Sequence, residues 1–183
     1  MGTIVVNDTN IFIDLISVDL LDEFFSLPID IHTTDFVVHE LTEPLQQKKV
    51  ESYIRQNKLT VKLHSAIEVI EIVEFQTTCE NNVSITDCSV WLYAKKNNYT
   101  LLTGDGKLRK SASKSGVEVC GILKIFDMLV EDYQIIPKQN GADMLEKLFK
   151  INNRRKHSKK CIFYTLRFGC SFAAVNTIKP QLL

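Results

Sequence analysis

The chain has 183 residues, 45% of them hydrophobic and 24% charged, so it is long enough for one domain with a buried core and too short for two domains of usual size. Its 22 Lys and Arg residues balance its 22 Asp and Glu residues, which excludes a global electrostatic attraction to nucleic acid. Any binding of nucleic acid must therefore come from local basic patches.

The five cysteines are odd in number, and no two of them have Cys-x-x-Cys spacing, which argues against a zinc site and a disulfide framework. The amino-terminal residues lack the basic and apolar regions of a signal peptide, and no apolar run has the length needed to span a bilayer. We therefore expect a soluble, cytoplasmic protein with free thiols and no membrane association.

Strand patterns alternate with helix patterns along most of the chain. Residues 4–6 form a continuous β-branched run, which is typical of a strand buried on both faces of a parallel sheet. The apolar residues from Ile11 onward have helical spacing, and Asp8, Thr9 or Asn10 can cap that helix. Further strands are predicted at residues 29–33, 59–63, 99–103 and 117–120.

The segments between these strands have mostly helical periodicity. Residues 66–78 have helical spacing together with many β-branched residues, so their pattern leaves the assignment open. Pro44 is expected to interrupt or kink the helix before it. The alternation predicts an α/β fold, a three-layer α/β/α sandwich with a mainly parallel central sheet. Helices are predicted at residues 18–27, 36–41, 46–57, 84–98, 107–115, 122–130 and 142–149.

The composition changes near residue 150. Residues 152–160 form a basic and polar run without periodicity, and residues 161–183 are apolar without the earlier strand and helix pattern. We expect one domain over residues 1–150 and a carboxy-terminal tail of open role over residues 151–183. A solvated linker is the favoured interpretation of the basic run, and an RNA-contacting arm is the alternative.

Four acidic residues have similar positions in this pattern, each at the end of a strand or in the first turn of a helix. The carboxyl ends of parallel strands meet at one edge of a sheet, so these carboxylates are expected to converge. Two carboxylates about 4 Å apart repel by about 4 kcal/mol at an effective dielectric constant near 20, so such a cluster takes up protons or binds cations. Oxygen ligands favour Mg²⁺ or Mn²⁺. The four residues are Asp8, Glu40, Asp87 and Asp105.

Each acid also has a simpler structural explanation. Asp8 can be a helix cap, Asp87 completes a capping-box pattern with Ser84, and Asp105 stands in a Gly-Asp-Gly turn. Glu40 has two neighbours, His39 and Glu43, that compete for the inward position. Only the arrival of all four at one edge would favour the metal-binding interpretation.

Four segments within residues 3–125 resemble, in order, the motifs of the PIN-domain ribonucleases. Each motif alone is weak, and the four together are specific. The segments are Asn-Asp-Thr-Asn-Ile-Phe-Ile-Asp from residue 7, Val-Val-His-Glu-Leu from residue 37, Ile-Thr-Asp-Cys-Ser-Val-Trp-Leu-Tyr-Ala from residue 85, and Leu-Leu-Thr-Gly-Asp-Gly-Lys-Leu from residue 101.

This resemblance implies a metal-dependent endoribonuclease in which a metal-activated water attacks the phosphodiester bond. The four acids would bind Mg²⁺ or Mn²⁺, and Asn10 or Thr103 would orient a carboxylate or the water. Many small members of the family are VapC-type toxins of toxin–antitoxin pairs, usually homodimers that an antitoxin silences. The resemblance therefore also implies an antitoxin partner and a homodimer.

One position departs from the family pattern. Many members carry a further acid or Asn soon after the fourth acid, whereas Gly106 and Lys107 follow Asp105 in this chain. The second metal position is therefore open, and so is the alternative of a catalytically degenerate module that binds RNA or protein. Lys107 and Arg109 are candidates for contacts with RNA phosphates, and a solvated basic face is the competing explanation.

Overall fold

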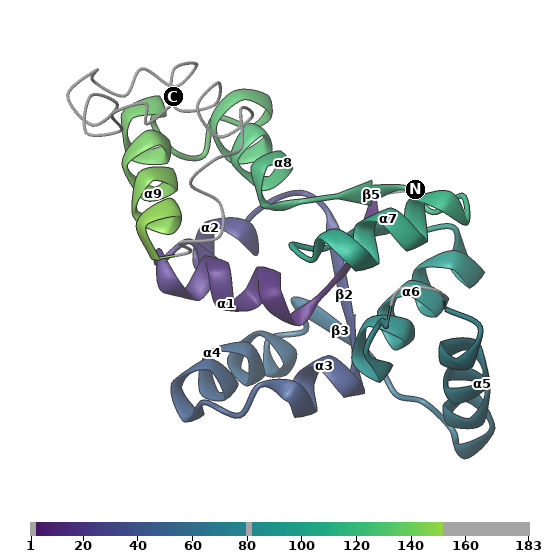
Figure 1. Cartoon of the computed structure of the whole chain (residues 1–183). Helices are drawn as coiled ribbons and strands as arrows, with labels where there is room; N and C mark the ends of the chain where they lie inside the picture. Colours follow the sequence, from purple (N-terminus) through teal and green to yellow (C-terminus); the bar gives the residue numbers. More distant parts are fainter. Residues whose placement is uncertain (1–2, 80–81, 152–183) are drawn as a thin grey trace. The chain divides into compact units, whose positions relative to one another are not determined.

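The computed structural model describes residues 3–79 and 82–151, which contain one five-stranded sheet (Figure 1). Every pair of neighbouring strands is parallel, and the strand order is β3-β2-β1-β4-β5. β1 therefore lies at the centre of the sheet, and the carboxyl ends of all the strands point to one edge. The strands are β1 (Ile4–Asn7), β2 (Asp30–Thr34), β3 (Leu59–Lys62), β4 (Thr100–Leu102) and β5 (Val119–Cys120).

Helices flank this sheet, which confirms the predicted three-layer α/β/α sandwich. The α-helices are α1 (Thr9–Ser17), α2 (Leu21–Phe24), α3 (Asp35–Glu40), α4 (Pro44–Arg55), α5 (Ala66–Thr77), α6 (Ile85–Asn97), α7 (Gly106–Lys114), α8 (Ile122–Asp127) and α9 (Lys138–Ile151), and a π-helical turn covers Met128–Asp132. α6 packs on β1, β2 and β4, and α5 packs beside α6 (Figure 1). On the described residues, no helix has both the length and the apolar character to cross a bilayer.

The hydrophobic core follows from the apolar runs of the sequence. Val5 and Val6 in the central strand are both buried, as expected for a strand that is covered on its two faces. Residues 66–77, whose pattern left two possibilities, form α5. Ser65 and Glu68 complete a capping box at its first turn, which offsets the low helix propensity of the β-branched residues.

The predictions for residues 18–27 and for Pro44 were wrong. The helix expected at residues 18–27 is reduced to the single turn α2, because Asp19 has a left-handed backbone with φ of 55° and interrupts the helical path. Pro44 neither interrupts nor kinks a helix. It begins α4, where a missing amide hydrogen costs nothing, and Glu43 caps this helix through the amides of Leu45 and Gln46.

The chain divides into two compact units, Met1–Ile125 and Phe126–Leu183. The first unit holds the whole sheet and all four acids of interest. In the second unit a Cβ atom on Gly141 of α9 would lie 2.6 Å from Cγ2 of Val130, so the small glycine permits a close approach between these two segments. The predicted tail beyond Ile151 lies outside the described residues, so the boundary predicted at residue 150 stays a prediction.

Candidate active site

Asp8 stands directly after the central strand and caps α1. Its backbone amide donates to the carbonyl of Leu102 at 3.0 Å, which continues the pairing of β1 with β4. Its Oδ1 accepts from the amide of Thr9 at 2.7 Å, and its Oδ2 accepts from the hydroxyl of Thr103 at 2.8 Å. The residue is only 1% exposed. Burial raises the pKa of Asp8 to about 6, and the negative charge of Asp87 contributes to this rise. The hydrogen bonds from Thr103 and Thr9 lower the pKa and so offset part of the rise.

Thr103 connects Asp8 to Asp105. Its hydroxyl donates to Asp8 and accepts from the backbone amide of Asp105 at 3.0 Å. The Asp105 carboxylate caps α7, because its Oδ1 accepts from the amides of Lys107 and Leu108 at 2.7 and 2.8 Å. Asp8 and Asp105, which are far apart in sequence, therefore stand at adjacent strand ends on the same edge of the sheet.

Glu40 reaches the same edge through Thr9. The Thr9 hydroxyl donates to Oε2 of Glu40 at 2.5 Å, and Thr9 is the residue next to Asp8. Glu40 is the last residue of α3, so its predicted place in the first turn of that helix was wrong. The sequence pattern predicted Thr9 only as a possible cap, although its place between Asp8 and Asn10 marks it as a neighbour of the site.

Asp87 completes the group from the first turn of α6. Its backbone amide donates to the Ser84 hydroxyl at 3.0 Å, and its carboxylate accepts from the Ser84 amide at 3.1 Å, which confirms the predicted capping box. Partial burial raises the pKa of Asp87, and the negative charges of Asp105 and Glu40 raise it further. Because Asp87 also raises the pKa of Asp8, it interacts electrostatically with all three other acids.

Asp87 is close enough to the other three carboxylates for their charges to repel, and this property fits a cation. Within residues 3–79 and 82–151, no three His, Cys, Asp or Glu side chains are arranged as a ready-made set of metal ligands. Mg²⁺ commonly uses only one or two carboxylates and completes its shell with water and substrate phosphate, so a preformed set of three is not required. The all-oxygen donors suit a hard divalent ion.

Comparison with known proteins decides the family. A family model described as the PIN domain matches residues 4–161. The chain belongs to the PIN-domain family. The resemblance found in its four sequence motifs is thereby confirmed. PIN domains are generally nucleases and usually use divalent metal ions.

Two solved structures are similar to this PIN domain in fold. One is a domain of a functionally unknown protein from Methanocaldococcus jannaschii, with 20% identity over 66% of this chain and 91% of that chain, at a TM-score of 0.47. The other is FitAcB from Neisseria gonorrhoeae, with 16% identity over 63% of this chain and 95% of that chain, at a TM-score of 0.40. No curated protein matches the chain in sequence.

The remaining predicted site residues of the PIN domain lie around the acids. The Asn10 side-chain amide approaches Oδ2 of Asp8 at 3.4 Å, and Lys107 is exposed at the start of α7. The Arg109 guanidinium donates through Nη2 to the carbonyl of Thr103 at 2.7 Å. Arg109 therefore supports the residue that joins Asp8 to Asp105, and its predicted contact with RNA phosphate stays untested.

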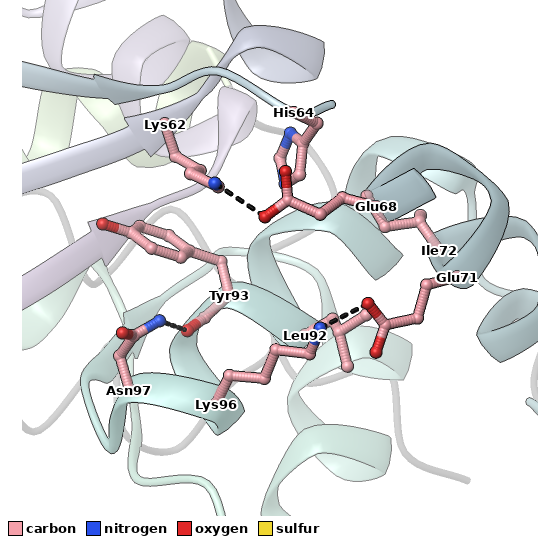
Figure 2. A pocket seen from close by; sticks show the side chains of 9 residues that line it. All are labelled: Lys62, His64, Glu68, Glu71, Ile72, Leu92, Tyr93, Lys96 and Asn97. Carbon is pink, nitrogen blue, oxygen red and sulfur yellow. Dashed lines mark hydrogen bonds and ion pairs between the residues drawn. The ribbon is translucent and has the colours of Figure 1, made fainter. Parts of the chain in front are cut away.

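Two cavities lie near the helices of the PIN domain. The first, of about 270 Å³, contains none of the four acids, and its charged side chains are paired, Lys62 with Glu68 at 2.7 Å and Lys96 with Glu71 (Figure 2). Because the charges within each ion pair balance, these described side chains offer no unbalanced charge to a ligand in the cavity. The second, of about 500 Å³, shares Glu40 with the candidate site.

Proposed function

We propose that this PIN domain is an endoribonuclease that depends on Mg²⁺ or Mn²⁺, with Asp8, Glu40, Asp87 and Asp105 as the metal-binding residues. The observation that carries the proposal is the hydrogen-bonded chain from Glu40 through Thr9 to Asp8 and from Asp8 through Thr103 to Asp105. Three carboxylates linked in this way, with the charge of Asp87 acting on each of them, favour cation binding.

The residues of the chain would prepare the site for phosphodiester hydrolysis. When bound, the metal supplies Lewis-acid activation of water and neutralises charge on the phosphate. Hydrogen bonds from Thr9 and Thr103 fix the orientation of the Asp8 carboxylate, so the lone pairs that remain free point in a fixed direction. The exposed Lys107 at the start of α7 is placed to attract an RNA phosphate. The reaction requires no protein nucleophile.

Cleavage of labelled RNA tests this proposal. Purified protein should cut single-stranded RNA in Mn²⁺, and EDTA should abolish the reaction. Asp8→Asn should lower the rate by at least 10²-fold, because removal of a single stabilising group of the transition state typically has an effect of this size. The exposed Asp143→Asn on α9 is the matched control and should retain the wild-type rate. Unchanged cleavage by Asp8→Asn would contradict the enzyme assignment.

A catalytically degenerate module that binds RNA or a protein is the second candidate. Gly106 follows Asp105 where many family members have a further acid, and this departure favours it. In that case the wild-type protein would retain labelled RNA or a protein partner without cutting it in either Mg²⁺ or Mn²⁺. The cleavage assay separates the two candidates.

We also propose that the protein acts in the cytoplasm as the toxin of a toxin–antitoxin pair, as a homodimer with an antitoxin partner. Its support is the resemblance to the small toxins of the family. Induced expression should arrest bacterial growth, and Asp8→Asn should relieve the arrest. Coexpression of the protein encoded by the neighbouring reading frame should also relieve it. Normal growth during expression of the active nuclease would contradict the toxin role.

A further inference from the structure

The second cavity opens beside the candidate metal site. Its volume of about 500 Å³ is within the range of about 300 to 1,000 Å³ that is typical of small-ligand pockets. Because Glu40 lines the cavity and is also hydrogen-bonded to Thr9 of the site, a ligand in the cavity would lie next to the reacting phosphate. The described lining residues are Asp35, Phe36, His39, Glu40, Val69 and Thr86.

One wall of the cavity is an aromatic ring held in a fixed position. Phe36 is half-buried and meets the His64 ring edge to face, with the centroids 5.5 Å apart at an angle of 73°. The Asp35 carboxylate fixes His64 at two points, through Nδ1 at 2.6 Å and through the backbone amide at 3.0 Å. The Asp35 carboxylate also accepts from the amide of Phe36 at 3.0 Å. This network prepares the Phe36 ring before any ligand arrives.

The charges of the cavity determine what kind of group it accepts. Among its described lining residues there is no Lys or Arg, and His39 is the one basic side chain, whereas Asp35 and Glu40 carry two carboxylates. A phosphate group would be repelled there. A flat, neutral ring can pack against Phe36 and Val69, and N–H donors on its edge can meet the carboxylate and hydroxyl oxygens. A nucleobase has both properties.

We infer that this cavity receives an unpaired nucleobase of the RNA strand, next to the phosphodiester bond that is cut. The inference deepens the proposed ribonuclease function and rests on it. Proteins that bind single-stranded RNA stack its bases on aromatic side chains. In this arrangement the acids hold the phosphate end through the metal, while Phe36 holds the adjacent base.

RNA binding without metal tests the inference separately from catalysis. We would measure fluorescence anisotropy of the full chain with a short, unstructured, end-labelled RNA in EDTA. Phe36→Ala should weaken binding about tenfold, because base stacking on an aromatic side chain contributes about 1 to 3 kcal/mol. Phe36→Trp should restore binding. Ile67→Ala on α5 is the matched control, because Ile67 is 79% exposed and does not line the cavity.

A second series identifies the base. We would measure binding to RNAs that each carry one abasic nucleotide, at a different position in each RNA. Where the missing base is the one that enters the cavity, binding to the wild type should weaken about tenfold, and binding to Phe36→Ala should not change. Phe36→Leu, which keeps an apolar side chain, replaces Phe36→Ala if circular dichroism shows that the alanine variant does not fold.

The two assays have different failures. If Phe36→Ala binds RNA as Ile67→Ala does, the base site is wrong, and the nuclease proposal is unaffected as long as the wild type cuts RNA in Mn²⁺. If stacking is observed and no condition gives cleavage, the base site is supported and the nuclease proposal fails. Equal loss of binding in Phe36→Ala and Ile67→Ala would also overturn the base site, because binding would then not depend on the aromatic ring.

Discussion

At the scale of single residues, the site is organised around a carboxyl group that is costly to ionise. Asp8 is nearly fully buried, and the negative charge of Asp87 adds to the effect of burial on its pKa. Thr103 and the amide of Thr9 offset only part of this cost, since the pKa still lies well above the ordinary value of 3.8. Such a group lowers the stability of the folded protein, a cost that is common at functional sites.

The first prediction concerns the stability of the metal-free protein. Protonation of Asp8 stabilises the folded state below pH 3.8, and this contribution is lost as the pH rises through about 6. The loss amounts to about 3 kcal/mol, at 1.36 kcal/mol per pKa unit. In EDTA, Asp8→Asn should therefore be more stable than the wild type at neutral pH, and the difference should shrink in acid. Urea unfolding at both ends of this range measures it.

Addition of Mn²⁺ provides the control for this prediction. The ion should raise the unfolding midpoint of the wild type, because binding to the folded state stabilises it, and it should have little effect on Asp8→Asn. The exposed Asp19→Asn should follow the wild type in both respects. An equal pH dependence in wild type and Asp8→Asn would refute the assigned cost of ionisation.

The second prediction concerns Thr9, whose hydroxyl holds Glu40. Thr9→Val keeps the shape of the side chain and removes the donor, so Glu40 should lose its fixed orientation. Residues that orient metal ligands typically change metal affinity by about 10- to 100-fold when they are replaced. Titration of free Mn²⁺ by electron paramagnetic resonance should show a loss of this order, and Thr9→Ser should retain the affinity. Equal affinities in all three proteins would exclude the role of Thr9.

At the scale of elements, β4, α7 and β5 are joined by one side chain. Arg109 reaches from α7 to the carbonyl of Thr103, which directly follows β4. Its guanidinium occupies the space beside Gly121, which directly follows β5, and a Cβ atom there would lie 2.2 Å from Nη2. A residue with a side chain at position 121 would have to push Arg109 away from Thr103, and Thr103 is hydrogen-bonded to Asp8.

This arrangement gives the third prediction. Gly121→Ala should lower the free energy of unfolding by about 1 kcal/mol, because Arg109 must move and give up its hydrogen bond to Thr103. The effect should be smaller when Arg109 is also replaced by alanine, because the two groups no longer compete for the same space. Gly106→Ala is the control, since no atom of the described residues lies within 4 Å of the added atom. Additive effects of the two substitutions in urea unfolding would argue against the contact.

At the scale of the whole molecule, charge decides how the protein can meet RNA. The chain has equal numbers of basic and acidic residues, and the candidate site is itself acidic. If the protein is the proposed ribonuclease, its binding of RNA must therefore combine a few local basic contacts with base stacking and the bound metal. Few phosphate contacts imply a weak dependence of affinity on salt concentration.

The fourth prediction follows from this charge balance. On single-stranded RNA, each phosphate contact contributes about 0.7 to the slope of log affinity against log salt concentration. Lys107→Ala should reduce the slope by about that amount. Lys96→Ala, whose side chain is paired with Glu71 outside the site, should leave it unchanged. Identical slopes for Lys107→Ala and the wild type would remove Lys107 from the RNA-binding surface.

The sequence by itself determined the α/β fold, its parallel sheet and the edge at which Asp8 and Asp105 stand. Apolar periodicity is local, and parallel strands all end on the same side, so these features need no knowledge of packing. The capping role of Asp87 was also visible, because a capping box is complete within four residues. The left-handed backbone of Asp19, by contrast, has no clear signal in its neighbours.

Only the tertiary structure decided which side chains meet. Thr9 bonds to Glu40 across 31 positions and Thr103 to Asp8 across 95, and the wall of the cavity depends on contacts of Phe36 with a distant histidine. Such contacts depend on how whole helices pack against the sheet. A difference of one side-chain rotamer would make or break them, and no local pattern of residues encodes that choice.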